Sequence, residues 1–326
     1  MRTEDCATRS QSSVLVAQPV GVMAITGHIQ EIGASEHKLA MRDLKPLSGL
    51  GQEEREDFWP AWVAITPRRR AEIARALVEL AEDDIELDFA AVQIWLLDDD
   101  DSEVRASAID GLWENTSATL LHQLLRLMRS DPAPAVRAAA TLSLSRFAYL
   151  AELDELDARD SQALRDGLLA MILDARQPLE VRRRALESAG YFGGVDEIQR
   201  QIELSYASDE QLLRESALVA MGRSMLERWL PTIGRELASQ SPALRYEAAR
   251  AAGEMGEDAR TLLPKLATLL NDHDSEVALA AIWALGQVGG DAAKRMLQQV
   301  RKSEDETRRQ AAADALEELA LGDNLV

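Results

Sequence analysis

Apolar residues recur along this chain at helical spacing, in a unit that returns seven times. Each unit starts at an anchor, apolar in all but one case, and has Ala four residues later. The anchors are Val104, Val136, Val181, Leu213, Leu244, Val277 and Thr307. Successive anchors lie 32, 45, 32, 31, 33 and 30 residues apart. Such a period predicts stacked helix pairs, in which each pair buries its apolar face against its neighbours.

The unit over residues 258–290 shows how one helix pair is built. Leucines at helical spacing fill its first half, which stops at Asn271 and Asp272. Asp274 precedes the anchor Val277 by three residues, where a carboxylate can cap the N–H groups of a second helix. Asp101 and Ser241 have the same offset in their repeats and are predicted caps too.

The second helix of each unit has one apolar face. In the 258–290 unit this face comprises the anchor and the residues 4, 5, 8 and 11 places later, and we expect it to be buried. The alanine at the fourth place marks the closest approach to a neighbouring helix, where a larger side chain would overpack. Glycine recurs nine places after four anchors, at Gly190, Gly222, Gly253 and Gly286.

The pattern predicts that about eight helix pairs make up most of the chain. The expected pairs cover residues 53–82, 86–115, 118–148, 161–192, 195–222, 226–255, 258–288 and 290–320. The pair at 53–82 lacks the motif and is expected to be a variant cap. The 45-residue interval contains an acidic insertion near 149–161, expected to lengthen a helix or form a loop. The predicted domains are a partly disordered tail and cap region, 1–50, and a repeat array, 51–326.

The form D-x-x-V-R-x-x-A-x-x-A-L-G, in helix pairs of some thirty residues, resembles the HEAT repeat. It is most similar to the short bacterial subclass that is named for phycobilisome lyase subunits. The resemblance covers residues 86–320 and implies an all-α fold, a right-handed α-solenoid. The same repeat serves scaffolds, chromophore lyases and a metal-dependent hydroxylase, so the resemblance leaves the function open.

The composition argues against several classes of partner and does not identify one. The formal charge of −20 argues against nonspecific binding of nucleic acid or anionic membranes, because phosphates require clustered cations. One cysteine, Cys6, excludes a disulfide framework, and a cytoplasmic location is expected. The apolar stretch 14–26 is too short and too interrupted to span a membrane, and it lacks the basic start of a signal peptide. Whether residues 1–22 belong to the mature protein stays open.

For the charged residues near the anchors and in charged runs, we favour structural roles over ligand binding. Arg follows six anchors directly, and we expect it to pair with an Asp or a helix-end carbonyl of an adjacent repeat. The acidic run 98–101 lacks the alternate spacing of a calcium loop and is interpreted as helix capping. The arginine triplets 68–70 and 182–184 are isolated, which favours surface and register roles over nucleic-acid binding.

No catalytic, metal-ligating or cofactor-binding set is predicted. Deoxyhypusine hydroxylase, an enzyme of similar build, holds two irons with His-Glu dipeptides. This chain has four histidines and none is followed by Glu; Tyr246 and Glu247 occupy the position that such a dipeptide would take. Tyr is no substitute for imidazole in that site. Phosphate loops and nucleophile elbows are absent from the sequence as well. We therefore expect a non-enzyme without cofactor.

A binding groove is expected along the second helices, at the positions 2 and 6 places after the anchor. Apolar side chains cluster there in three neighbouring repeats, with arginines beside them, as interface anchors do. The predicted groove residues are Arg183, Val219, Tyr246, Arg250, Leu279 and Trp283, with Trp113 as a second anchor nearer the N-terminus. Alternatively, Leu279 and Trp283 pack under the last repeat.

The sequence thus predicts a monomeric scaffold or adaptor that binds a protein or peptide partner, and neither nucleic acid nor membrane. This function rests on analogy between folds. The alternative is a lyase- or oxidoreductase-like protein that acts on a bound chromophore or metal.

Overall fold

A computed structural model describes residues 22–34 and 39–323, and all regular secondary structure in these ranges is helical. The predicted all-α solenoid fold is confirmed. The right-handed turn of the array stays a prediction. The chain divides between Val104 and Arg105 into two compact units, each with its own core. Cys6 and most of the stretch 14–26 lie outside the described residues.

The first unit is built around large aromatic side chains. Its α-helices are α1 (Val22–Gly33), α2 (Arg55–Val63), α3 (Pro67–Asp83) and α4 (Ala90–Leu96), with 3₁₀ helices at Met41–Asp43, Lys45–Leu47 and Gln52–Glu54. Phe58 stacks on Trp62 and lies against Trp95, and all three rings are buried. α1 packs on α2 and buries Ile29. The region predicted as a cap is thus helical from Val22.

The acidic run 98–101 makes hydrogen bonds and ion pairs with other residues of this unit. Asp99 accepts a hydrogen bond from Trp62 Nε1 at 2.6 Å, and its carboxylate lies 3.4 Å from Arg70 Nη1. Asp101 accepts from the N–H groups of Glu103 and Val104, so the predicted capping is confirmed. The surface role predicted for the triplet 68–70 is wrong for Arg69 and Arg70, which are buried. Arg70 reaches Asp99 and Asp100, and Arg69 donates to the carbonyl of Ile32.

The second unit consists of two layers of helices. The first helices of the pairs are α6 (Ala118–Ser130), α9 (Ala158–Leu173), α11 (Asp196–Tyr206), α13 (Leu230–Glu236), α15 (Leu263–Leu269) and α17 (Gly290–Val300). The second helices are α7 (Pro134–Ser143), α10 (Leu179–Ala189), α12 (Gln211–Arg223), α14 (Pro242–Glu254), α16 (Ser275–Val288) and α18 (Glu306–Asp323). Helix α5 (Ser102–Asp110) crosses the division between the units.

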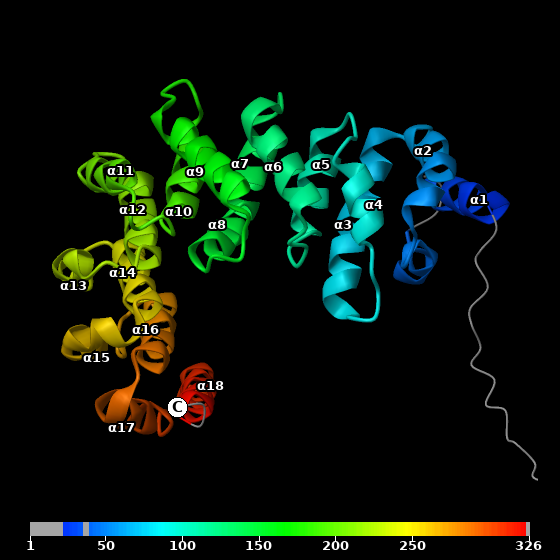
Figure 1. Ribbon diagram of the computed structural model, residues 1–326. Helices are drawn as coiled ribbons and strands as arrows, with labels where there is room; N and C mark the ends of the chain where they lie inside the picture. Colours follow the sequence, from blue (N-terminus) through cyan, green and yellow to red (C-terminus); the bar gives the residue numbers. More distant parts are fainter. Residues whose placement is uncertain (1–21, 35–38, 324–326) are drawn as a thin grey trace, which may run out of the picture. The chain divides into compact units, whose positions relative to one another are not determined.

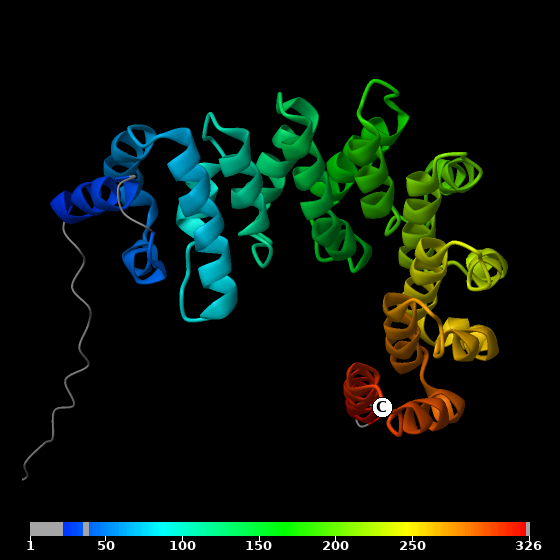
Figure 2. The ribbon, with the colours of Figure 1, turned by 180° about the vertical axis from the view of Figure 1, so that it is seen from behind.

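The second helices form one continuous layer. Each packs on the next from α7 to α18, while α11, α13, α15 and α17 pack along the outside of this layer (Figure 1 and Figure 2). The 3₁₀ helices Glu227–Trp229 and Gly256–Leu262 lead into α13 and α15. Part of the acidic insertion forms the end of a separate helix, α8 (Ser145–Glu152), and a turn then leads into α9.

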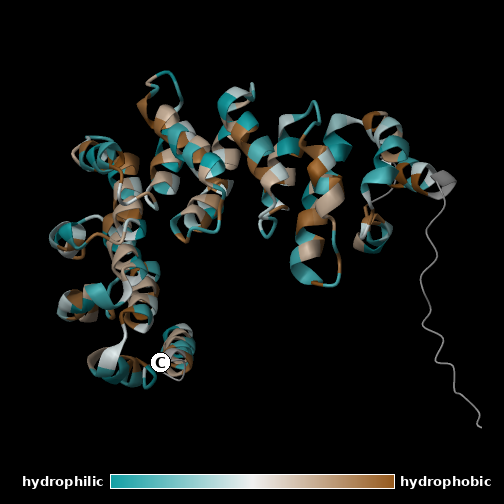
Figure 3. Cartoon of the chain, viewed as in Figure 1, coloured by the Kyte–Doolittle hydropathy of each residue, from teal (hydrophilic) through white to brown (hydrophobic). Residues whose placement is uncertain are grey.

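The predicted core positions are buried as expected. The helices carry hydrophobic and hydrophilic residues side by side (Figure 3), and the faces that begin at Val181 and Val277 lie inside. The alanine four places after the anchor is fully buried in the first six repeats, and Ala311 of the last repeat is half-buried. Gly222 lies so close to α14 that a Cβ there would come within 2.7 Å of the Ala251 Cα. Small residues therefore set the spacing of the layer.

Four of the six arginines that follow the anchors join neighbouring repeats, as predicted. Arg105 and Arg245 each donate two hydrogen bonds, at 2.7–2.8 Å, to Asp131 and Asp272 of the following repeat. Arg137 donates to Gln177 of the following repeat, and Arg308 to carbonyls of the preceding one. Arg182 instead reaches a carbonyl of its own repeat. Arg214 is a second exception, because its buried Nε has no hydrogen-bond partner among the described residues.

The predicted helix caps are confirmed at Asp274 and wrong at Ser241. Asp274 Oδ1 accepts from the N–H groups of Glu276 and Val277, at 3.0 and 3.3 Å. The Ser241 side chain accepts no bond from the N–H groups of α14, although its backbone has the extended conformation of a cap. Pro242, the first residue of that helix, already removes one N–H that would need a partner.

Candidate binding cleft

The second helices α10, α12 and α14 of the larger unit, together with Leu142 of α7, line a cleft of about 550 Å³. Four arginines and four glutamates line it together with four uncharged residues. They are Arg183, Arg184, Arg223, Arg250, Glu187, Glu215, Glu247, Glu254, Leu142, Val219, Tyr246 and Ala251. The floor includes Ala251, the residue on which Gly222 packs.

Four of the seven predicted groove residues line this cleft: Arg183, Val219, Tyr246 and Arg250. Trp283 lies beside it, because its ring stacks under the Arg250 guanidinium at 3.7 Å and covers Gly253 of the same helix. Trp283 therefore packs on the repeat before it. Leu279 is half-buried, and Trp113 is 58% exposed in the turn after α5; neither lines the cleft.

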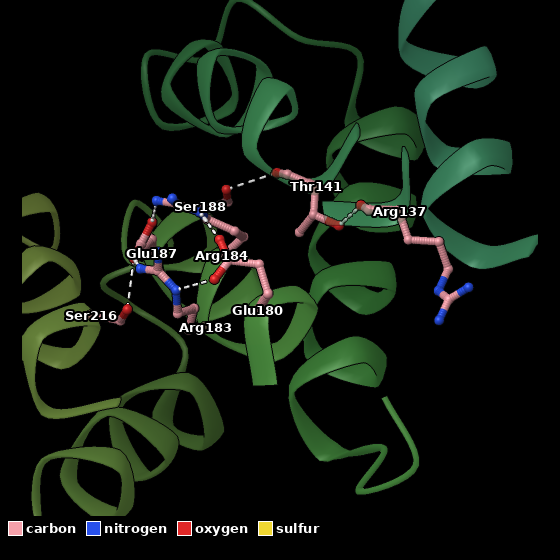
Figure 4. Close-up of polar contacts among 8 residues, drawn as sticks. All are labelled: Arg137, Thr141, Glu180, Arg183, Arg184, Glu187, Ser188 and Ser216. Atoms are coloured by element: carbon pink, nitrogen blue, oxygen red, sulfur yellow. Dashed lines mark hydrogen bonds and ion pairs between the residues drawn. The ribbon is translucent and has the colours of Figure 1, made fainter. Parts of the chain in front are cut away.

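One side of the cleft is a closed network of ion pairs. Glu187 on α10 is buried and accepts from Arg183 at 3.0 Å, Arg184 at 2.9 Å and the Ser216 hydroxyl at 2.6 Å. Both arginines also reach Glu180 one turn earlier, which Figure 4 shows. These charge-assisted bonds leave Glu187 little capacity for a ligand. Arg183 and Arg184 of the triplet 182–184 therefore organise this wall.

The remaining arginines of the cleft are engaged too. Arg223 donates to the backbone carbonyl of Glu187 at 2.9 Å and lies over the Tyr191 ring. Arg250 lies 3.5 Å from Glu254 and stacks on Trp283. Every cation that lines the cleft thus has a partner within the protein.

Glu247 differs from its neighbours. It is half-buried, and no hydrogen bond or ion pair joins its carboxylate to any described residue. Burial, followed by repulsion from Glu187 and Glu215, raises the pKa of Glu247 to about 7. Arg250 and Arg183 oppose this shift without cancelling it. Glu215 makes no ion pair with a described residue either; it accepts one hydrogen bond, from Gln211. The cleft therefore holds two carboxylates that lack a cation.

A second cleft, of about 500 Å³, adjoins the first at Tyr246. It lies at the N-terminal ends of α14 and α16 and has a more apolar lining. The residues around it are Gln211, Ser241, Pro242, Ala243, Tyr246, Asp274, Glu276 and Val277. Because Tyr246 lines both clefts, one ligand can occupy both only by passing this ring.

The residues predicted from the sequence include two of the four arginines that line the cleft and none of its four glutamates. Glu187 and Glu215 occupy the positions 6 and 2 places after their anchors, which were already assigned to the groove face. Glu247 follows Tyr246 directly and was considered only as half of a His-Glu substitute. Arg250 follows Glu247 by one helical turn, so spacing along the chain predicts a paired glutamate and gives no signal that Glu247 makes no ion pair.

In residues 22–34 and 39–323, no three His, Cys, Asp or Glu side chains gather as a metal site. No helix in the same ranges is long and apolar enough to cross a membrane.

The profile of HEAT repeats matches residues 89–168 and 230–317, slightly more than half of the chain. The chain belongs to the HEAT repeat family. The second matched range includes α14 and α16. Helices α10 and α12 lie in residues 169–229, between the two matched ranges. The phycobilisome-lyase subclass stays a prediction.

Solved HEAT-like structures are similar over most of the chain at low identity. An engineered protein is 19% identical, over 92% of this chain and 90% of its own, with a TM-score of 0.39. Human deoxyhypusine hydroxylase in complex with glycerol is 21% identical, over 93% and 99%, with a TM-score of 0.29. Kap95p, in a structure with RanGDP, is 15% identical over 90% of this chain and 46% of its own, with a TM-score of 0.46. No curated protein matches the sequence.

Proposed function

We propose that this protein is a non-enzymatic adaptor that binds a segment of a partner protein in the cleft on α10, α12 and α14. One observation carries the proposal: a cleft of about 550 Å³ whose arginines are internally paired while Glu247 and Glu215 lack a cation. A solvated helix face gains nothing from a half-buried carboxylate without a partner, because its desolvation is unfavourable. A ligand that supplies the missing contacts offsets the unfavourable desolvation of such a carboxylate.

The size and lining of the cleft fit a polypeptide. Arginine and aromatic side chains, here Arg250, Tyr246 and the adjoining Trp283, are the residue types that dominate protein interfaces. Val219 and Leu142 supply apolar contact between the charged groups. HEAT-repeat arrays commonly present such extended surfaces to other proteins. With a single cysteine in the sequence, we place this adaptor in a reducing compartment such as the cytoplasm.

Affinity capture from the source cells with three baits tests the proposal. Wild type and Leu204→Ala, which alters an exposed residue of the outer helix α11, should retain the same partner. Tyr246→Ala should lose it while its melting temperature stays close to that of wild type, since Tyr246 is only half-buried. Retention of every partner by Tyr246→Ala would refute the assignment of the cleft. A coloured or metal-containing purified protein would instead favour the lyase- or oxidoreductase-like alternative.

A further inference from the structure

We infer that the cleft recognises a lysine or arginine side chain in an extended, otherwise apolar segment of the partner, with the cation seated between Glu247 and Glu215. This inference rests on the proposed function and specifies the chemistry of the partner. It commits to one occupant, a peptide segment with a basic residue.

Charge complementarity is the first ground for this occupant. The four arginines of the cleft are bonded to Glu180, Glu187, Glu254 or a backbone carbonyl. They have little left to offer an acidic ligand. Glu247 and Glu215 lie on adjacent helices, α14 and α12, and neither has a cation of its own. A guanidinium or ammonium group between them satisfies both carboxylates at once.

The second ground is the connection between the two clefts. Tyr246 lines both the cleft that contains the carboxylates and the more apolar cleft at the start of α14 and α16. A cation beside Glu247 lies next to this ring, and the segment that carries it can continue into the apolar cleft. A small cation such as an amine would leave the second cleft empty. Two clefts of about 500 and 550 Å³ that share Tyr246 in their linings match several residues of extended chain.

The third ground is that an unoccupied site is electrostatically unfavourable at neutral pH. The groups that face Glu247 are Glu187 and Arg183 on α10, Glu215 on α12, and Arg250 on its own helix. Burial and the two glutamates outweigh the two arginines and raise the pKa of Glu247 to about 7. A bound cation favours the ionised form, so affinity should fall as the pH drops below about 7 and Glu247 takes up a proton.

The test uses the full-length protein and a phage-displayed library of random dodecapeptides. We select the peptides that bind the wild-type protein and do not bind the Tyr246→Ala protein, because their binding depends on Tyr246. They should share one required Lys or Arg among apolar residues. The best peptide is then synthesised with a fluorescent label, together with a version in which the basic residue is Ala.

Glu247→Gln should weaken binding of the labelled peptide about 10- to 100-fold and remove most of the pH dependence between pH 5.5 and 8. Glu257→Gln is the matched control, because Glu257 is an exposed glutamate beside Arg260, outside both clefts. It should leave affinity and pH profile unchanged. The Gln variant keeps the shape of Glu and removes a repulsive charge, so it should fold.

Two results distinguish failure of this inference from failure of the proposed function. Tyr246-dependent peptides that need no basic residue, or that bind Glu247→Gln as tightly as wild type, would overturn the inference and leave the adaptor function standing. Absence of any Tyr246-dependent peptide, with self-association that Tyr246→Ala abolishes, would overturn both, because the occupant would then be a second copy of the chain.

Discussion

Two carboxylates on neighbouring repeats, Asp272 and Glu247, have opposite environments although both lie close to arginines. Asp272 lies at the junction between the repeats of α14 and α16 and receives two hydrogen bonds from Arg245, at 2.7 and 2.8 Å. These bonds hold the pKa of Asp272 below its usual value. Glu247, on the same helix as Arg245, has no such partner, and its pKa is raised to about 7.

This comparison distinguishes a carboxylate that holds two repeats together from one that we propose to bind a partner. At the junction every donor and acceptor of the pair is used, so the contact fixes the register of two repeats and presents nothing to a ligand. In the cleft the arginines are used in the same way, but the carboxylates outnumber them once Glu180 is included. Carboxylates without an ion pair on a half-buried face are therefore the feature on which the proposed binding site rests.

Breaking the junction should have the largest effect on stability. Asp272→Ala leaves the mostly buried Arg245 without its carboxylate and should lower the free energy of unfolding by about 3–5 kcal/mol at pH 7. Because the folded pKa of Asp272 is lowered, its stabilising effect exists above the unfolded pKa and disappears as the pH falls through the folded one. Urea titrations at pH 7 and pH 3 measure both. An equal loss at both pH values would contradict the ion-pair account.

Neutralising the cleft carboxylate should act in the opposite direction. A raised folded pKa means that Glu247 stabilises the fold only while it is protonated, and that this stability is lost as the pH rises through about 7. Glu247→Gln should therefore be more stable than wild type at pH 8, by an amount on the order of 3 kcal/mol, and equal to it near pH 4. Melting curves across this range provide the measurement. A destabilised variant at pH 8 would mean that Glu247 has a partner inside the protein.

Widening the spacing of the two helices under the cleft should have a smaller effect. Gly222→Ala places a methyl group against the Ala251 backbone, and overpacking of this kind destabilises by about 1–3 kcal/mol. It should also weaken partner binding, because Ala251 lines the cleft. Gly194→Ala is the matched control, since a Cβ there meets nothing within 4 Å. Chemical denaturation of both variants tests this; equal stabilities would remove the role assigned to Gly222.

The smallest effect concerns the helix cap beside the second cleft. Asp274→Ala removes two hydrogen bonds to the start of α16 and should lower stability by about 1 kcal/mol. Ser241→Ala, at the same place in the preceding repeat, should change stability by less than half as much, because Ser241 caps nothing. Thermal unfolding of the two variants under one buffer condition compares them. A larger loss for Ser241→Ala would reverse the assignment.

The repeat architecture was readable from the sequence because it depends on local periodicity. The spacing of apolar residues identified the eight helix pairs, and the buried faces at Val181 and Val277 followed from 3.6 residues per turn. Arg245 was expected to bond across the junction, since its place next to the anchor puts it at the edge of the core. The cap at Asp274 followed from chemistry over three residues. Each of these features repeats, so each was visible several times.

The cleft depended on contacts between side chains of different repeats, which no single period encodes. Glu187 and Glu247 are both glutamates that line the cleft. Arg183, Arg184 and Ser216 bond to Glu187, whereas no described residue forms a hydrogen bond or ion pair with Glu247. Trp283 was expected in the groove, whereas Gly253 leaves room for its ring against α14. Periodicity determines which face of each helix is buried. Only the tertiary packing of α10, α12 and α14 decided which charges on the other face are neutralised, because neutralisation depends on distances of a few ångströms between neighbouring helices.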